Sequence, residues 1–146
     1  MALIVSEADI EKLATYGEFR GNRWGRHITY KKGKIENFIV LKGVLLCYVN
    51  IGFDDEEEFI TSTMRIFLVE PSNNNDLGRW SFWFNETEVH CQIELIAPPK
   101  VFYPMCQALS TKRPNSLYNV FLHTELEKLS KSDNCITEYS LGFIEK

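Results

Sequence analysis

Apolar and polar residues alternate along most of the chain, and this period of two predicts β-strands. The pattern is clearest where Trp80, Phe82 and Phe84 point one way and a second alternating run begins at Val89 after a short turn, which is typical of a hairpin. The strands expected from such runs cover residues 24–30, 35–41, 43–53, 59–69, 80–84, 89–95, 117–124 and 135–143.

Polar and glycine-rich segments predict the connections between these strands. The segment 17–34 is expected to contain a loop, the first strand and a turn at Lys32-Gly33, and a break between strands is expected at Lys42-Gly43. The acidic run 54–58 is expected to be a solvated turn. Residues 71–78 give the strongest loop signal, because Pro, Asn, Asp and Gly either fix φ or bond to their own backbone.

Two segments carry helical signals instead. Ser6 is a favourable N-cap followed by acidic residues, so a helix is expected at residues 7–16. Apolar residues at intervals of four from Val101 to Leu109 predict a second, short helix. Pro104 fits that helix if it lies in the first turn, where backbone N–H groups have no intrahelical partner.

These elements predict an α+β fold. We expect a mostly antiparallel β-sheet or sandwich of about seven or eight strands, with one N-terminal helix and one short internal helix. No repeat or linker divides the chain, so residues 1–146 are expected to form a single domain. Parallel winding is disfavoured because most strands lack a helical crossover between them.

Composition restricts the classes of function. Sixteen basic and twenty acidic residues give a net charge of −4, which argues against a dedicated duplex-DNA binder. The residues before Ser6 resemble neither a secretory signal nor a membrane span, so a cytoplasmic protein is expected. The four cysteines show no metal-ligand spacing, and Cys47 and Cys91 lie in apolar runs typical of buried thiols. No metal or other cofactor is expected.

Charge is distributed unevenly along the chain. Residues 1–53 hold eight basic and five acidic side chains, whereas residues 54–146 hold eight basic and fifteen acidic ones. The first hypothesis is therefore a non-enzymatic binding protein that recognises a basic protein, such as a toxin or effector that it neutralises. The residues expected to contact that partner are Asp54, Asp55, Glu56, Glu57, Glu58 and Trp83.

The alternative hypothesis rests on the basic segment 20–34. Guanidinium groups, glycines and aromatic rings in one segment suit RNA, single-stranded DNA or a phosphorylated ligand. The residues expected to bind phosphate are Arg20, Arg23, Trp24, Arg26, Tyr30 and Lys32. A third hypothesis is an enzyme, which would need a concave site joining His27 or Cys106 to these arginines.

Overall fold

A computed structural model describes residues 4–51, 54–69, 76–86, 88–113, 116–132 and 134–144. These residues form two helices and eight strands. In chain order the elements are α1 (Glu7–Ile10), β1 (Leu13–Lys31), β2 (Lys34–Ile51), β3 (Asp54–Leu68), β4 (Gly78–Asn85), β5 (Glu88–Ala97), α2 (Pro99–Thr111), β6 (Leu117–His123), β7 (Asn134–Cys135) and β8 (Glu138–Ile144).

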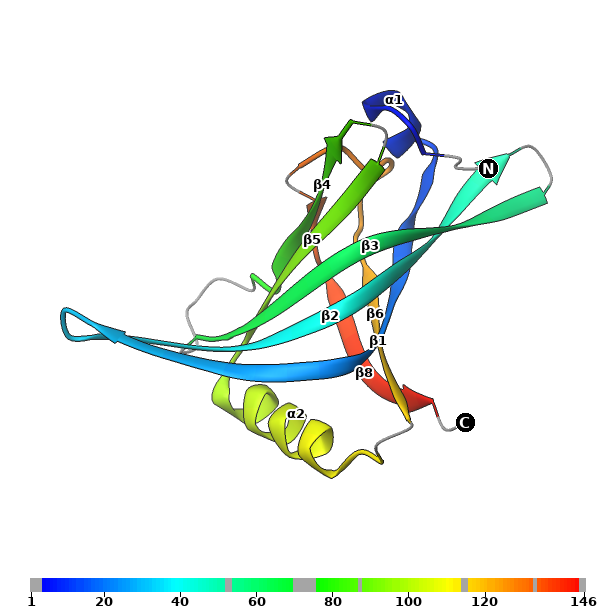
Figure 1. Cartoon of the computed structure of the whole chain (residues 1–146). Helices are drawn as coiled ribbons and strands as arrows, with labels where there is room; N and C mark the ends of the chain where they lie inside the picture. Colours follow the sequence, from blue (N-terminus) through cyan, green and yellow to red (C-terminus); the bar gives the residue numbers. More distant parts are fainter. Residues whose placement is uncertain are drawn as a thin grey trace.

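All eight strands belong to one sheet with the order β7-β4-β5-β3-β2-β1-β6-β8. Neighbouring strands are antiparallel except β3 and β5, which run parallel. The sheet curls into a half-barrel, with α1 at one end and α2 at the other (Figure 1). The hairpin of β1 and β2 projects beyond the other strands.

The concave side of the half-barrel holds the hydrophobic core, and we call it the inner face. Its centre is formed by Phe19, Leu45, Trp80, Ile93 and Tyr118, all fully buried. Buried residues of α2, including Phe102 and Leu109, close one end of this core. The opposite side of the sheet, which we call the outer face, is covered by neither helix of the described segments (Figure 1).

The structure confirms a β-rich fold with an N-terminal and an internal helix, but it corrects the expected sheet. The strands form one mixed sheet, neither strictly antiparallel nor a sandwich. The β4–β5 hairpin is present as expected, but it docks with β5 beside β3. β5 therefore lies between β4 and β3, and its inner face buries four residues: Cys91, Ile93, Leu95 and Ala97.

Gly17, Gly21 and Gly25 are part of β1, so the expected loop after residue 17 is wrong, whereas the expected turn at Lys32-Gly33 is present. α1 ends at Ile10 instead of residue 16, and β1 is continuous from Leu13 to Lys31 with a bulge between Gly21 and Arg23. A Cβ on Gly43 would lie 2.0 Å from the backbone oxygen of Arg20. These glycines therefore allow close approach of two backbones, and β2 passes Lys42-Gly43 without a break.

Three further expectations are corrected. The acidic run is part of β3, because the chain reverses before it and Glu56, Glu57 and Glu58 pair with the end of β2. Pro104 lies beyond the first turn of α2, whose first residue is Pro99. The strand expected at 135–143 is two strands, because β7 pairs with β4 and β8 pairs with β6 at the other edge of the sheet.

Candidate binding face

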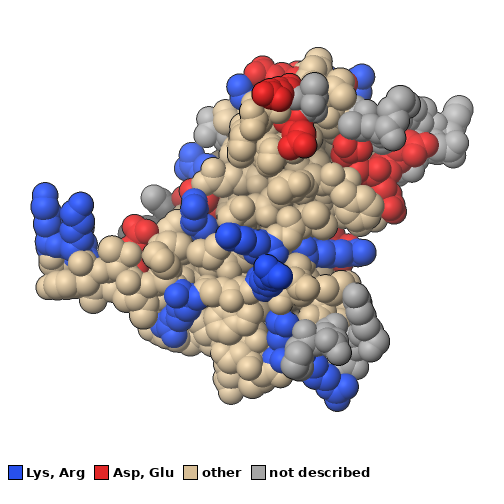
Figure 2. Space-filling view, in the orientation of Figure 1, with Lys and Arg blue, Asp and Glu red and all other residues tan. Residues whose placement is uncertain are grey.

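Three cations meet at the centre of the outer face. Arg23 of β1 lies directly across from Lys42 of β2, and Arg65 of β3 lies across from Val40, the outward-facing neighbour of Lys42 on the same strand. We call Arg23, Lys42 and Arg65 the basic cluster. Figure 2 shows Lys and Arg side chains in a band across the middle of this face and at the hairpin tip, with most acidic side chains towards the end that holds α1.

The basic cluster is not neutralised by the described part of the chain. No ion pair joins Arg23, Lys42 or Arg65 to an acid whose side chain is described. Glu94 is the register neighbour of Arg65, but its carboxylate accepts a hydrogen bond from the Gln92 side chain at 3.2 Å. Like charges directly opposite each other in a sheet are destabilising, so the Arg23–Lys42 pair costs stability in the unbound protein.

Arg20 differs from the three cations of the cluster. Its guanidinium donates to the carboxylate of Glu18 at 2.7 Å, and Asn119 donates to the same carboxylate at 2.9 Å. Burial raises the pKa of Glu18, but the hydrogen bonds from Arg20 and Asn119 outweigh it and hold the pKa below its ordinary value. The hydrogen bond to Glu18 also raises the pKa of Arg20. Arg20 is therefore already paired.

A buried tyrosine fixes the backbone below the basic cluster. The Tyr118 hydroxyl of β6 donates towards the backbone oxygen of Lys42 at 3.2 Å and towards that of Arg23. It reaches both because Gly21 leaves room, since a Cβ there would lie 2.4 Å from the tyrosine oxygen. Burial raises the pKa of Tyr118 well above its ordinary value, so the hydroxyl keeps its proton.

Three hollows follow one another along the outer face. A hollow of about 280 Å³ lies over Gly25 and Val40 and is bordered by Arg23, Lys42 and His27. A smaller one of about 160 Å³ lies between Arg65 and Trp83. The largest, of about 850 Å³, lies between the hairpin tip and the strands β3, β5 and β4.

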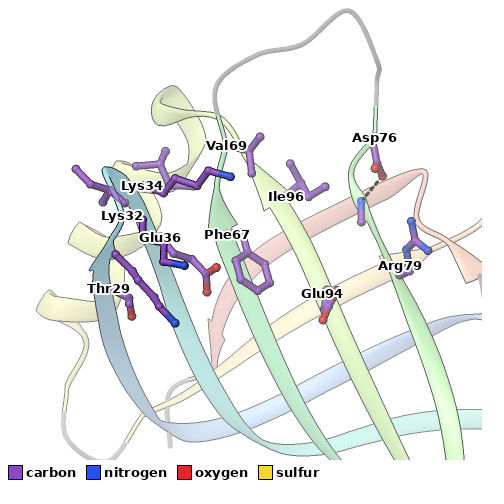
Figure 3. Close-up of a pocket in the computed structure, with 14 residues that line it drawn as sticks. Thr29, Lys32, Lys34, Glu36, Phe67, Val69, Asp76, Arg79, Glu94 and Ile96 are labelled. Atoms are coloured by element: carbon purple, nitrogen blue, oxygen red, sulfur yellow. Dashed lines mark hydrogen bonds between the residues drawn. The ribbon is translucent and has the colours of Figure 1, made fainter.

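The largest hollow has mixed charge. In Figure 3, Lys32, Lys34 and Glu36 lie on its hairpin side, and Asp76 and Arg79 lie on the opposite side. Apolar groups of Phe67 and Ile96 lie between them. Because its cations alternate with carboxylates, including Glu94, this groove favours anions less than the basic cluster does.

Aromatic rings border the basic cluster on both sides. His27, Phe38 and Phe67 form a row across three strands, with ring centroids 5.1 and 5.2 Å apart. On the other side Trp83 stacks on His90 with centroids 4.2 Å apart, and 43% of Trp83 is exposed. Aromatic groups of this kind offer stacking surfaces for planar ligands.

The predicted phosphate-binding residues divide between the two faces. Arg20 and Arg23 lie on the outer face, but Trp24, Arg26 and Tyr30 lie on the inner face, because side chains alternate along β1. Arg26 packs over the rings of Phe102 and Tyr103 of α2 at 5.6 and 5.8 Å and donates to Asn37. Lys32 is in the hairpin turn with a φ of 53°.

The predicted protein-binding residues are also separated. Trp83 lies on the outer face of β4, whereas Glu56 and Glu57 are exposed near the start of β3 and Glu58 is half-buried. The side chains of Asp54 and Asp55 lie outside the described residues. Sequence reasoning missed Lys42 and Arg65, although the polar face of the 59–69 alternation already contained Arg65.

Other candidate chemistry is limited in the part of the chain that is described. Burial raises the pKa of Cys47, Cys91 and Cys106, which keeps these thiols protonated. His27 borders the hollow next to Arg23, as the enzyme hypothesis required, but Cys106 is on α2 below the inner face. The described side chains include no group of three or more His, Cys, Asp or Glu placed to hold a metal ion.

Comparison of the chain with protein-family models, curated proteins and solved structures gives no match. Neither helix of the described segments is long and apolar enough to cross a lipid bilayer.

Proposed function

We propose that the outer face binds single-stranded nucleic acid. The basic cluster is the observation that carries this proposal. Arg23, Lys42 and Arg65 come from three adjacent strands and present unpaired positive charge at one place on the face. Phosphate groups would relieve the repulsion between them, because arginine and lysine side chains form charge-assisted hydrogen bonds with phosphate oxygens.

The surroundings of the cluster suit an extended strand with exposed bases. The hollow over Gly25 and Val40 is almost wholly apolar and opens beside the His27–Phe38 pair of rings. On the other side of the cluster, the exposed Trp83 ring offers a second stacking surface. Single-stranded binding commonly combines a positively charged track with aromatic platforms of this kind.

The net charge of −4 is compatible with a local anion site. On the face seen in Figure 2, most acidic side chains lie towards the end that holds α1, and the Lys and Arg side chains form the band across the middle. At physiological ionic strength the charges of that end are screened over a distance of roughly 8 Å, so the field near Lys42 is set by its neighbours.

The test is fluorescence anisotropy with labelled oligouridine and oligothymidine, at a series of salt concentrations. Three phosphate contacts predict a slope of about −2 in a plot of log affinity against log salt. Arg23→Gln, Lys42→Gln and Arg65→Gln should each weaken binding by about tenfold, or roughly 1.4 kcal/mol, and should each make the slope shallower by about 0.7.

Lys100→Gln and Lys128→Gln are matched controls, because each removes one exposed positive charge outside this face. If they weaken binding as much as Lys42→Gln does, the interaction is nonspecific attraction and the proposal fails. Equal affinity for a duplex of the same length would also contradict it, since a duplex cannot stack its bases on Trp83. Comparison of oligouridine with oligothymidine then distinguishes RNA from DNA.

A second candidate function is binding of a basic protein, as the acidic residues first indicated. It is favoured by an apolar patch on the outer face near Glu57, formed by the exposed rings of Tyr16, Phe59 and Phe121. Exposed aromatic residues are frequent at interface hot spots. We propose a cytoplasmic neutralising role for this case. Purification of the protein from the native host, with and without nuclease, separates the two candidate functions. A protein partner that copurifies in stoichiometric amount after nuclease treatment, and that the Phe59→Ser variant no longer binds, supports only the second function.

A further inference from the structure

The outer half of β1 has an open edge. β6 pairs with β1 only from Tyr16 to Gly21, whereas β2 pairs with β1 as far as Lys31. From Asn22 to Lys31, no strand of the described chain lies on the other side of β1. This edge is roughly 33 Å long at about 3.3 Å per residue. Apart from the Arg23 carbonyl, which accepts from the Tyr118 hydroxyl, it therefore presents a row of backbone N–H and C=O groups without a strand partner in the described chain, which is a template for adding another strand.

The side chains along this edge alternate in character. On the outer face the edge carries Arg23, His27 and Lys31. On the inner face, beyond the part covered by α2, it carries Ile28 and Tyr30, which are 62% and 72% exposed. Ile35 of β2 lies directly across from Tyr30 and is 69% exposed, so it extends the same apolar strip. Asn22 to Lys31 contains no acidic residue.

A complementary strand must match both faces. Its side chains on the outer side would meet Arg23 and Lys31, so carboxylates are favoured there. Its side chains on the inner side would meet Ile28 and Tyr30, so apolar groups are favoured there. The segment that fits is therefore extended and alternates acidic and apolar residues.

A second copy of this chain fits the edge poorly. The edge carries Arg23, Arg26 and Lys31 and no acidic residue, so any register that pairs two copies brings cations together without a carboxylate. About a two-fold axis at His27, for example, Arg23 of each copy would lie directly across from Lys31 of the other. Like charges directly opposite in a sheet are destabilising, and this register would contain two such pairs. Charge complementarity thus selects an acidic partner over self-association.

We infer that the β1 edge from Asn22 to Lys31 is a β-augmentation site for an extended acidic-apolar segment of another protein. In this mode main-chain hydrogen bonds supply affinity and alternate side-chain contacts supply specificity. The site shares Arg23 with the basic cluster, but it does not need Lys42 or Arg65, so the two proposals can be tested separately.

The test uses a labelled ten-residue peptide of alternating Glu and Ile, acetylated and amidated at its ends, with binding followed by anisotropy. Ile28→Ser and Tyr30→Ser should each weaken binding by about two- to fivefold, because each removes one apolar cross-strand contact. Both side chains are largely exposed, so these variants should fold normally. Lys42→Gln should leave peptide binding unchanged while it weakens oligonucleotide binding, which separates the two proposals.

Hydrogen exchange supplies the structural readout. Bound peptide should slow exchange of backbone amides between Asn22 and Lys31, whereas the same peptide methylated on alternate backbone nitrogens should not. The inference is overturned if the Glu–Ile peptide does not bind, if a Lys–Ile peptide binds equally well, or if protection appears elsewhere in the sheet. It is also overturned if the protein dimerises through this edge and Ile28→Ser abolishes the dimer.

Discussion

The hydrogen bonds of the Tyr118 hydroxyl lead to a quantitative prediction for the stability of the protein. Tyr118→Phe keeps the buried ring, which lies parallel to Phe19 at 6.2 Å, and removes only the hydroxyl. The single hydroxyl proton, which the backbone oxygens of Arg23 and Lys42 share, is then lost. A buried acceptor left unsatisfied costs about 1–3 kcal/mol, so we expect the free energy of unfolding to fall by about that amount. For a chain of this length this corresponds to roughly 3 °C in Tm per kcal/mol.

Tyr139→Phe is the matched control. Tyr139 is half-buried, and its hydroxyl also donates to a backbone oxygen, that of Ile96 at 2.9 Å, but it makes one such bond and lies away from the basic cluster. We expect this control to lose about 1 kcal/mol. Urea unfolding followed by circular dichroism measures both variants, with the slope m checked for two-state behaviour.

The same variants test the link between Tyr118 and the binding face. Tyr118→Phe should weaken oligonucleotide binding, because the carbonyl bonds that position Arg23 and Lys42 are lost, whereas Tyr139→Phe should leave binding unchanged. The reasoning is refuted if Tyr118→Phe loses no more stability than Tyr139→Phe, or if it loses stability without any change in affinity.

Three other outcomes follow from single residues. Folding lowers the pKa of Glu18, so the stability that Glu18 contributes is complete above its ordinary pKa of 4.5 and is lost as the pH falls through its pKa in the folded protein. In unfolding measured as a function of pH, Glu18→Gln should therefore lose less stability on acidification than the wild type. Cys135 is the exposed thiol, so Ellman's reagent should label one thiol rapidly in the folded protein and four after denaturation, and Cys135→Ser should abolish the rapid phase. A Cβ on Gly25 would meet no atom within 4 Å, so Gly25→Ala should stabilise by about 0.5 kcal/mol, whereas Gly43→Ala should destabilise strongly through its contact with Arg20; thermal unfolding compares the two.

Local patterns predicted the elements whose environment is local. The β4–β5 hairpin followed from the alternation on both sides of a short turn, and α2 followed from apolar residues at intervals of four. Gly21 of β1 was misread because its role depends on Tyr118, which lies far away in the sequence. A glycine in a loop and a glycine under a tyrosine hydroxyl look the same in one sequence.

The candidate site could be predicted only in part from the sequence, because it too depends on residues that are far apart along the chain. A basic segment was visible, but a strand sends alternate side chains to opposite faces, so Arg23 and Arg26 have different surroundings. Lys42 and Arg65 join Arg23 only through the register of three strands, which no local pattern specifies. The parallel pairing of β3 with β5 was missed because it depends on how a finished hairpin docks on a finished sheet.

The pairing of β1 with two different strands bears on the order of events during synthesis. β2 follows β1 immediately, so the two can zip together while the polypeptide is still emerging from the ribosome. β6 comes much later, and the Asn119–Glu18 bond spans 101 positions. A nascent chain that stops short of β6 therefore has a long hairpin in which Gly21 is uncovered and the backbone oxygens of Arg23 and Lys42 lack the Tyr118 hydroxyl. The proposed binding face is complete only when the last third of the polypeptide has been made.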